Sequence, residues 1–403
     1  MRKLWIVTEL FYPDETSTSY ILSNIANKLV EKYEINVISG SALYQKNKII
    51  KNDSFILDDK INVFKVSNKE LDKNNLLQRT LKIISLTINL SNTLFKKVNK
   101  DDKVFIVTNP APLLIVISIL KRFKKFELCI LVHDVFPENT IPARIIKKNS
   151  SIIYRIVKPI FNLAYSSADC LIVLGRDMKD VFIDKLSKYK KIPKIEIIEN
   201  WGDTINIKPY KNETSKISLR HDNNIVTIQY AGNIGRTQGL KEFIEIFTKS
   251  TSNIHLDMWG DGAMKDEIVN FVNNNNLKNK ISFYGYYSRT EQNDILNSTD
   301  ISLITLADGM YGLGVPSKAY NIIASGKPIL FIGKLNSEIA LMIQEEEIGF
   351  CFDPTDSIAI NRFLNEISLS KIQDFKIMGE KARRIAENIY SEKKILDKYI
   401  KIL

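Results

Sequence analysis

Residues 225–247 read IVTIQYAGNIGRTQGLKEFIEIF, so an apolar run, a glycine-rich turn and a helical pattern follow one another directly. The apolar run 225–230 has the length and composition of a strand, and such a strand–turn–helix unit is typical of an open α/β sheet. Gly232 and Gly235 let the turn approach a ligand closely, and Arg236 supplies a fixed positive charge. We predict that this turn holds a diphosphate; a tight glycine turn beside a solvated arginine is the plainer interpretation.

The same alternation of strand and helix patterns runs through the whole chain. Short apolar runs predict further strands at 4–8, 34–39, 62–66, 103–108, 128–132, 170–174 and 195–198, and then at 255–259, 281–284, 301–306 and 328–332. Apolar residues at helical spacing predict helices at 20–31, 76–98, 113–123, 152–166, 239–247, 263–272, 292–297, 316–324 and 337–344, and from about residue 358 onward. Strands that alternate with helices of this length form parallel sheets covered on both faces.

The length of 403 residues favours two domains, because a domain usually has about 100–200 residues. A turn-rich stretch begins with NWGD at 200–203 and stays polar to residue 224, after which the strand pattern restarts. We predict an α/β protein with two Rossmann-like, doubly wound parallel-sheet domains that face a central cleft. The predicted limits are 1–203 and 204–375, with helices at 376–403 returning to the first domain.

The formal net charge of +11 is carried by the first half of the sequence. Lys and Arg outnumber Asp and Glu by 33 to 21 in residues 1–200, whereas the remainder has 24 against 25. A basic half favours an acidic partner such as anionic lipid, a phosphorylated substrate or nucleic acid, and a low-GC genome that favours lysine codons is the neutral explanation. Since no helix-turn-helix, zinc or RNA-binding signature is present, we expect no nucleic-acid partner.

The cysteines and the lengths of the apolar runs predict the cellular compartment of the protein. Cys129, Cys170 and Cys351 lie far apart in apolar or strand-like stretches without a CxxC pair, which is typical of reduced cytosolic proteins. The N-terminal MRKLWIVTELFYP has too short an apolar run for a signal peptide. The longest apolar run, 111–120, is well short of the roughly 20 residues that a spanning helix needs. We therefore expect a cytoplasmic protein.

A second turn that precedes a helix reads GLGVPSKAYNIIASGKP at 312–328. Pro316 suits the first position of a helix, and the last glycine suits its C-terminal exit. The free N–H groups near Val315, Ser317 and Lys318, together with the Lys318 side chain, would then form an anion site. The alternative is a well-capped core helix.

Two loops of the first half follow predicted strands. LVHDVFPE at 131–138 places His133, one of only three histidines, beside an aspartate at the carboxyl end of a strand. This position favours a functional role over the structural role that a lone histidine usually has. FYPDETST at 11–18 places hydroxyl side chains at a helix start, where capping alone is the alternative. The candidates on the acceptor side are Glu15, Thr16, Ser17, Asp134 and Glu138.

Together these motifs resemble the retaining GT-B glycosyltransferases, which include bacterial lipopolysaccharide and capsule sugar transferases. The resemblance covers nearly the whole chain and rests on the order of FYPDET, VHDVFPE, ADCLIVLGRDM, ENWGDTINIKP, AGNIGRTQGL, WGDG, ISFYGYYSRTE and GVPSKAYNIIASGKP. The closest subgroup is the N-acetyl-L-fucosaminyl transferase type of O-antigen synthesis. The resemblance implies a GT-B fold and transfer from a UDP-sugar to an undecaprenyl-diphosphate-linked acceptor, with retention at the anomeric carbon.

The resemblance also implies roles for individual residues. His133 matches a histidine that contacts the donor sugar, Tyr286 and Tyr287 match the stretch beside the base, and Thr16 and Ser17 take the place of paired glycines. The donor-side residues are Gly232, Asn233, Gly235, Arg236, Gln238, Tyr286, Tyr287, Val315, Pro316, Ser317, Lys318 and Asn321. The expected catalytic residues are His133, Arg236 and Lys318.

The chain departs from the family pattern at the diphosphate loop and at the ribose site. Many members have an Arg and a Lys where this chain has Asn233 and Gln238, so other cations are expected to meet the diphosphate charge. Many also carry two glutamates eight residues apart, where this chain has Leu313 and Asn321. An amide can still bond a ribose hydroxyl, whereas a carboxylate beside the anomeric carbon is missing.

We expect a reaction without a metal or a cofactor, because no DxD-like motif stands in a suitable loop. Arg236, Lys318 and helix N–H groups then meet the charge of the leaving nucleotide, and His133 orients donor and acceptor. One alternative is a UDP-sugar epimerase of the same two-lobed shape. Such an epimerase needs several catalytic carboxylates and histidines in its cleft, where this chain has few histidines. Another is a nucleic-acid-binding protein that uses the basic half.

Basic and apolar residues interleave in the first half. Four cations lie at 121–125 after an apolar helix, and five more flank isoleucines between residues 144 and 158. This pattern is typical of an interfacial segment, and solvated basic faces are the alternative. We expect peripheral association with the inner face of the cytoplasmic membrane, where a lipid-linked acceptor would lie.

Overall fold

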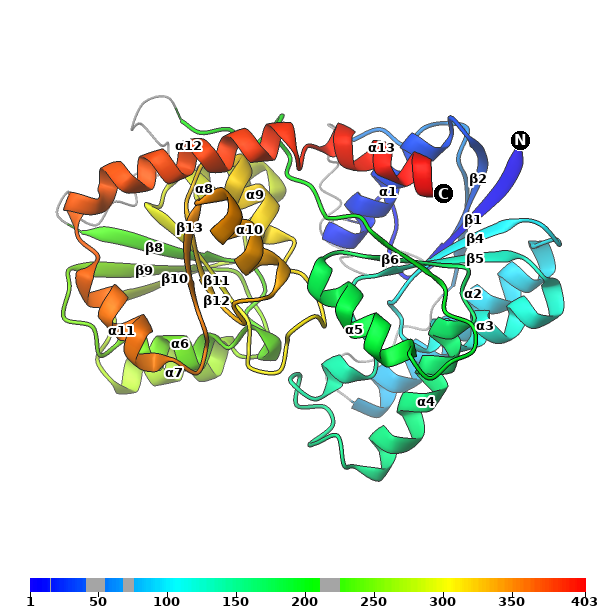
Figure 1. Ribbon diagram of the computed structural model, residues 1–403, viewed down its shortest axis with the longest axis horizontal. Helices are drawn as coiled ribbons and strands as arrows, with labels where there is room; N and C mark the ends of the chain where they lie inside the picture. Colours follow the sequence, from blue (N-terminus) through cyan, green and yellow to red (C-terminus); the bar gives the residue numbers. More distant parts are fainter. Residues whose placement is uncertain (15, 41–54, 68–75, 211–224) are drawn as a thin grey trace.

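The computed structural model describes residues 1–14, 16–40, 55–67, 76–210 and 225–403, and these residues form two α/β halves side by side (Figure 1). The first half contains a parallel sheet with the strand order β3-β2-β1-β4-β5-β6-β7. Its strands are β1 (Arg2–Thr8), β2 (Tyr33–Gly40), β3 (Asn62–Val66), β4 (Lys103–Val107), β5 (Glu127–Val132), β6 (Cys170–Val173) and β7 (Lys194–Ile197). This is the doubly wound order in which ligands bind at the carboxyl ends of the strands.

The second half repeats this topology with the order β10-β9-β8-β11-β12-β13. Its strands are β8 (Val226–Ala231), β9 (Ile254–Trp259), β10 (Ile281–Gly285), β11 (Ile301–Thr305), β12 (Ile329–Ile332) and β13 (Gly349–Phe352). Every residue of β4, β6, β8 and β11 is buried, because helices cover both faces of each sheet. The GT-B expectation of two Rossmann-like parallel sheets is thereby confirmed.

The helices lie against these sheets in chain order. In the first half they are α1 (Ser17–Leu29), α2 (Leu76–Lys97), α3 (Pro112–Lys124), α4 (Ile152–Ser166) and α5 (Arg176–Leu186). In the second they are α6 (Leu240–Phe247), α7 (Lys265–Asn274), α8 (Gln292–Asn297), α9 (Lys318–Ala324), α10 (Glu338–Glu346) and α11 (Ser357–Glu366). The chain ends with α12 (Ile372–Asn388) and α13 (Glu392–Ile402).

The C-terminal helices connect the two halves. α12 packs against α9 in the second half, whereas α13 packs against α1 in the first (Figure 1). The Tyr20 hydroxyl on α1 donates to the Glu392 carboxylate on α13 at 2.9 Å. The limit predicted between 375 and 376 falls inside α12, which packs against the second half, whereas α13 packs against the first. The domain limits themselves stay predictions.

The chain crosses between the halves a second time in the segment after β7, and the two crossings lie side by side. The Gly202 N–H donates to the Tyr390 carbonyl oxygen at 3.0 Å, and Gly202 forms an isolated parallel bridge with Ser391. A Cβ at Gly202 would lie 2.3 Å from the Tyr320 carbonyl oxygen, so only glycine fits there. Arg383 on α12 reinforces the contact by donating to the Thr204 carbonyl oxygen at 3.0 Å.

Several elements differ from the sequence expectation; α1, for example, was expected at 20–31 and spans Ser17–Leu29. α5 and β13 were not predicted, because α5 reads RDMKDVFIDKL with few apolar positions and β13 has four residues. The helix expected at 316–324 begins at Lys318 and has seven residues, so Pro316 lies before it and not at its first position.

Candidate active site between the two sheets

The loop after β5 and the loop after β11 meet where the two halves face each other. The Val135 N–H donates to the Leu313 carbonyl oxygen at 3.0 Å. A Cβ at Gly314 would lie 3.3 Å from the carbonyl oxygen of His133. The structure therefore brings His133, at the carboxyl edge of the first sheet, next to the loop that precedes Lys318.

His133 is held in place by its backbone. The N–H groups of His133 and Asp134 both donate to the Thr108 hydroxyl at 3.1 Å, and the Asp134 carboxylate accepts from the Asn109 side chain at 3.3 Å. Although His133 as a whole residue is only half-buried, its Nε2 is enclosed and has no hydrogen-bond partner among the described residues. Burial lowers the pKa of His133 to about 4 and raises the pKa of Asp134. The imidazole is therefore neutral at pH 7 and available to a ligand.

The glycine-rich turn after β8 lies beside Lys318. The Gly232 N–H donates to the Trp259 carbonyl oxygen and the Ile234 N–H to the Asp261 carbonyl oxygen, both at 2.9 Å. Gly232 has φ +141°, and a Cβ there would lie 2.8 Å from Lys318 Nζ. The WGDG motif at 259–262 thus holds the turn through backbone hydrogen bonds. The opposite side of the turn, at Gly232, faces Lys318.

Lys318 has an unusual environment for a lysine. Its Nζ lies 3.7 Å from the centroid of the Tyr230 ring, is enclosed, and has no hydrogen-bond or ion-pair partner among the described residues. Burial lowers the pKa of Lys318 to about 7. The Tyr230 hydroxyl donates to the Asn233 carbonyl oxygen at 2.6 Å, so one tyrosine supports both the turn and the lysine.

Two more buried polar atoms near the turn lack partners in the described part of the chain. One is Gln238 Oε1, which would lie 2.6 Å from a Cβ at Gly235, and the other is the indole nitrogen of Trp259. Buried polar atoms are normally paired, and an unpaired one costs roughly 1–3 kcal/mol. Together with His133 Nε2 and Lys318 Nζ, these atoms indicate a site for a polar, anionic ligand between the halves.

The remaining donor-side candidates lie around this turn. Val315 is buried before α9, with Pro316 and Ser317 half-buried beside it. Arg236 is exposed on the 3₁₀ turn Arg236–Gln238. Tyr286 is 70% exposed and stacks on Tyr287 at 6.4 Å between ring centroids.

Asn321 is engaged by the crossing segment that follows β7. Its side-chain oxygen accepts the Asp203 N–H at 3.0 Å, and its amide nitrogen lies 3.4 Å from the side-chain oxygen of Gln292. The amide that the resemblance assigns to a ribose hydroxyl therefore already holds the segment that connects the two halves.

The acceptor-side candidates are dispersed. The Thr16 hydroxyl accepts the Ser19 N–H at 3.2 Å and caps α1, whereas Ser17 is exposed. Glu138 is paired with Lys185 at 2.6 Å, and burial lowers the pKa of Lys185 to about 8. These contacts favour structural roles for Thr16 and Glu138. Glu15 lies outside the described residues.

Two residues of the site were missed by sequence reasoning. Tyr230 was seen only as the end of a strand, and Trp259 only as part of a glycine motif. The signal that could have found them is their position, because each is the last or next-to-last residue of a strand whose carboxyl end faces the cleft.

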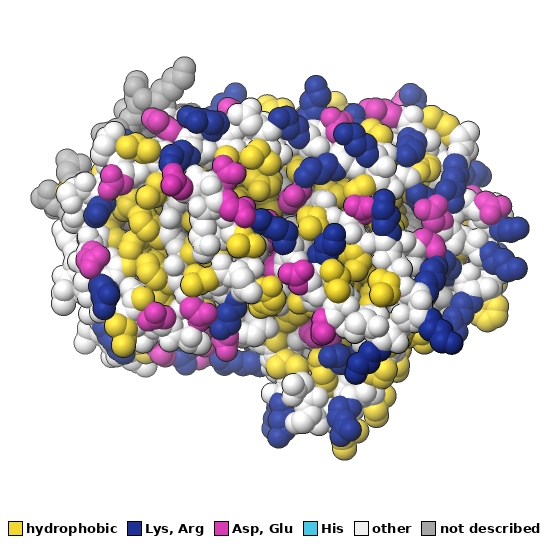
Figure 2. Space-filling model, in the orientation of Figure 1, with side chains coloured by type: hydrophobic (Ala, Val, Ile, Leu, Met, Phe, Trp, Pro, Cys, Tyr) yellow, Lys and Arg dark blue, Asp and Glu magenta, His cyan; other side chains and the backbone are white. Residues whose placement is uncertain are grey.

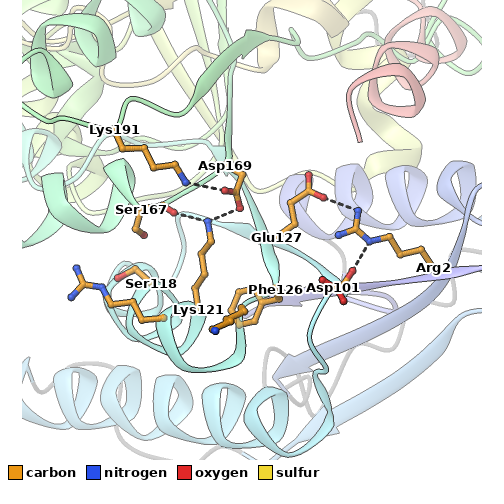
Figure 3. A pocket seen from close by; sticks show the side chains of 11 residues that line it. Arg2, Asp101, Ser118, Lys121, Phe126, Glu127, Ser167, Asp169 and Lys191 are labelled. Atoms are coloured by element: carbon orange, nitrogen blue, oxygen red, sulfur yellow. Dashed lines mark hydrogen bonds and ion pairs between the residues drawn. The ribbon is translucent and has the colours of Figure 1, made fainter.

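A separate hollow lies at the opposite edge of the first sheet, where β1, β4 and β5 begin (Figure 3). Its lining contains two ion pairs, Lys121–Asp169 at 2.5 Å and Arg2–Glu127 at 2.7 Å, beside Arg122 and Lys125, which have no ion-pair partner among the described residues. Because this edge carries the amino ends of the strands, the site between the halves remains the candidate. No group of three or more His, Cys, Asp or Glu residues within the described ranges could hold a metal ion.

Comparison with known proteins agrees with this geometry. Residues 211–392 match the family model "Glycosyl transferases group 1". The chain is 32% identical over 402 residues to the probable glycosyltransferase WbjE of Pseudomonas aeruginosa, covering 99% of this chain and 97% of that protein.

Solved structures share the fold at low sequence identity. Sucrose-phosphate synthase from Thermosynechococcus elongatus has a TM-score of 0.75 at 12% identity, covering 100% of this chain and 98% of that one. HepE from Anabaena in complex with UDP-glucose has a TM-score of 0.69 at 15% identity, covering 100% and 99%. WaaG, a glycosyltransferase involved in lipopolysaccharide biosynthesis, has a TM-score of 0.68 at 14% identity, covering 99% of each chain. With the full-length similarity to WbjE, these findings show that the chain belongs to the group 1 glycosyltransferases of the GT-B fold.

Proposed function

We propose that this glycosyltransferase moves a sugar from a UDP-sugar to an undecaprenyl-diphosphate-linked acceptor in O-antigen or capsule synthesis. The proposed donor carries an N-acetylated amino sugar such as N-acetyl-L-fucosamine, in keeping with the motifs that the chain shares with that transferase type. The observation that carries the proposal is the group of unpaired buried atoms at the junction of the halves, contributed by His133, Gln238, Trp259 and Lys318. A UDP-sugar offers phosphate oxygens, which accept from Lys318 Nζ and Trp259 Nε1, and hydroxyl groups, which donate to Gln238 Oε1 and pair with His133 Nε2.

The chemistry proposed at this site is one exchange of bonds. The bond between the anomeric carbon and the diphosphate oxygen breaks, and the acceptor hydroxyl oxygen bonds to that carbon on the same face. The hydroxyl proton passes to the departing phosphate oxygen. The Lys318 ammonium, the turn at Gly232 and, from its exposed position, Arg236 would stabilise the charge on the leaving group.

His133 would position the sugar in this scheme. It lies on the first half beside Gly314, and its neutral Nε2 has no partner in the described structure. A neutral imidazole can accept or donate a hydrogen bond to a sugar hydroxyl without a charge. We therefore propose that His133 orients the donor and the acceptor and does not act as a strong base.

A lipid-linked acceptor is supported by one face of the first half. α2 packs against α3 and α3 against α4, and all three expose large apolar side chains. These are Leu81, Ile84, Ile88 and Phe95 on α2, Ile119 and Phe123 on α3, and Ile152, Ile153, Ile156, Ile160 and Leu163 on α4. Figure 2 shows hydrophobic and basic side chains side by side over the projecting end of this half, where Figure 1 draws α4.

The cations of this face include several without an ion-pair partner among the described residues: Arg122, Lys125, Lys147, Lys148 and Arg155. None of the helices described here is long and apolar enough to cross a membrane. Apolar side chains flanked by unpaired cations fit the surface of an anionic bilayer, which we propose as the place where the acceptor is met.

A transfer assay tests the proposal. The purified chain is mixed with vesicles that contain undecaprenyl-diphosphate-linked N-acetylglucosamine and with one UDP-sugar at a time, with and without EDTA. We expect UDP release and a lipid product extended by one sugar in both conditions, because protein cations meet the leaving charge. Isomerisation of the UDP-sugar without transfer would instead favour the epimerase. Failure of every UDP-sugar to bind would overturn the proposal.

A further inference from the structure

Lys318 differs from the other cations of the site because it is enclosed without a counter-ion. Its Nζ contacts the ring of Tyr230, which is fully buried and fixed by the hydrogen bond from its hydroxyl to Asn233. An ammonium over a ring face gains about 0.5–2 kcal/mol, whereas removing the charge from water costs several kcal/mol. While no anion is bound, the site therefore favours the neutral amine more than water does, which lowers the pKa of Lys318.

The surrounding charges do not offset this cost. The titratable or charged groups on the elements around Lys318 are Tyr230 on β8, Arg236 on the turn, Tyr287 after β10, Asp308 and Tyr311 before α9, and His133 and Asp134 across the junction. On α12, which packs against α9, Arg383 donates to the Ala324 carbonyl oxygen. Asp308 pairs with Lys334 at 3.3 Å, and Asp134 accepts from Asn109. Lys318 is the one charged residue of α9, which reads KAYNIIA. Burial alone lowers the pKa of Lys318 to about 7.

We propose that Lys318 takes up one proton from solution when the diphosphate of a UDP-sugar enters the cleft, so that donor binding is coupled to pH. This inference rests on the donor site proposed above. The neutral amine and a proton from the buffer give an ammonium that pairs with the diphosphate oxygens, and no bond of the donor breaks. Gly232 makes the approach possible, because a side chain there would lie 2.8 Å from Nζ. The diphosphate provides both the counter-charge and the acceptors that the amine lacks.

Calorimetry measures this proton directly. UDP-N-acetylglucosamine is titrated into the protein in buffers of different ionisation enthalpy, because its diphosphate does not change protonation near neutral pH. The slope of observed enthalpy against buffer ionisation enthalpy gives the protons taken up. With the free-state pKa of about 7, we expect ~0.9 proton at pH 8 and ~0.1 at pH 6. The Kd should rise about fivefold from pH 7 to pH 8 and less than twofold from pH 6 to pH 7.

Variants assign the proton to one side chain. Lys318→Arg keeps a charge at every pH, so uptake should vanish while binding persists. Lys318→Met should lose uptake and bind more weakly at pH 6. Tyr230→Phe keeps the ring, and its uptake should remain. Lys249→Arg, at an exposed lysine after α6, is the matched control and should behave as the wild type. Thermal unfolding confirms that each variant is folded, and the wild-type pH series does not depend on any variant.

Two results would overturn the inference while leaving the donor site intact. One is binding of the UDP-sugar by the wild type at pH 8 without proton uptake. The other is wild-type uptake in Lys318→Met, which would move the proton to His133. Failure of the wild type to bind any UDP-sugar at any pH is a different outcome, because it would contradict the donor site itself.

Discussion

The guanidinium of Arg176, at the start of α5, pairs with the carboxylate of Glu338, at the start of α10, and so joins the two halves of the molecule at 3.0 Å. The Arg176 backbone N–H donates to the same carboxylate at 2.6 Å, and the Asp177 carboxylate accepts the Glu338 N–H in return. Each helix therefore supplies a carboxylate to the N-terminus of the other, where N–H groups lack partners within their own helix.

This exchange predicts a measurable coupling between the halves. In a double-mutant cycle with Arg176→Gln and Glu338→Gln, we expect a coupling of about 1–3 kcal/mol in the free energy of unfolding, because Glu338 is almost fully buried. The exposed pair Arg144–Glu242, which also joins the halves, is the control and should give less than about 1 kcal/mol. Urea unfolding measures both cycles. Equal couplings would mean that burial does not strengthen the Arg176 pair.

His133 should affect turnover more than donor affinity. We expect His133→Ala to lower kcat about tenfold to a hundredfold while the Kd for the UDP-sugar changes less than threefold, because the ring acts on the geometry of the reacting groups. Steady-state transfer kinetics and calorimetry measure the two quantities. A parallel loss of both would place His133 in donor binding alone.

The same histidine should make stability depend on pH. Its pKa is about 4 in the folded chain and about 6.5 when unfolded, so the unfolded state binds the extra proton first as the pH falls. The contribution of the neutral His133 to the free energy of unfolding is fully present above pH 6.5 and is lost as the pH falls toward 4. At pH 4.5 we expect the wild type to have lost about 2–3 kcal/mol relative to His133→Asn, compared with their difference at pH 7.5. Urea unfolding at the two pH values tests this, and an unchanged difference would contradict it.

Arg236 should contribute to donor affinity through its charge. We expect Arg236→Ala to weaken UDP-sugar binding about tenfold, the size of one charge-assisted hydrogen bond that is partly solvated. Arg362→Ala, an exposed arginine on α11, is the matched control and should leave the Kd unchanged. Calorimetry at two salt concentrations should show a steeper salt dependence for the wild type than for Arg236→Ala. Equal affinities would restrict diphosphate binding to the turn and Lys318.

The face of the first half that is formed by α2, α3 and α4 should bind anionic membranes. We expect the wild type to float with vesicles that contain anionic lipid and to be released by high salt. Replacing Lys147, Lys148 and Arg155 by Gln should weaken binding at least tenfold, since each cation contributes about 1 kcal/mol near the surface. Replacing Ile152, Ile153 and Ile156 by Ser should also weaken it. Ile358→Ser, at an isolated exposed isoleucine of the second half, is the control. Binding that is indifferent to salt and to both triple variants would contradict this surface.

Much of the fold follows from local patterns in the sequence. Buried runs such as VTIQYA in β8 contain few polar residues, and their spacing from glycine turns predicts parallel βαβ units. Helix α5 escaped this reasoning because its buried apolar residues are only Met178, Phe182 and Leu186 in a largely charged sequence, although they pack it against β6, β7 and α4 of its own half. The start of α9 was placed two residues early because Pro316 suits a first helical position, yet Pro316 lies in the loop that meets His133.

The candidate site was only partly predictable for a similar reason. Gly232 and Lys318 could be proposed separately from their turns, but their proximity depends on the tertiary structure. The same holds for Glu138, whose position in a cleft loop suggested a ligand role, whereas the structure pairs it with Lys185 on α5. A charged residue at the carboxyl end of a strand predicts the position of a ligand site. Whether its side chain is free to bind a ligand depends on its ion-pair and hydrogen-bond partners in the folded chain.

The paired crossings at Gly202 and Ser391 have a mechanical consequence. Because two segments pass between the halves at one place, cutting either of them leaves the halves tethered by the other. A swing of one half against the other about this double tether would open or shut the site beside His133, whereas Gly232 and Lys318 both lie in the second half and would keep their contact. Protease nicking at one crossing should therefore yield fragments that stay together on a sizing column.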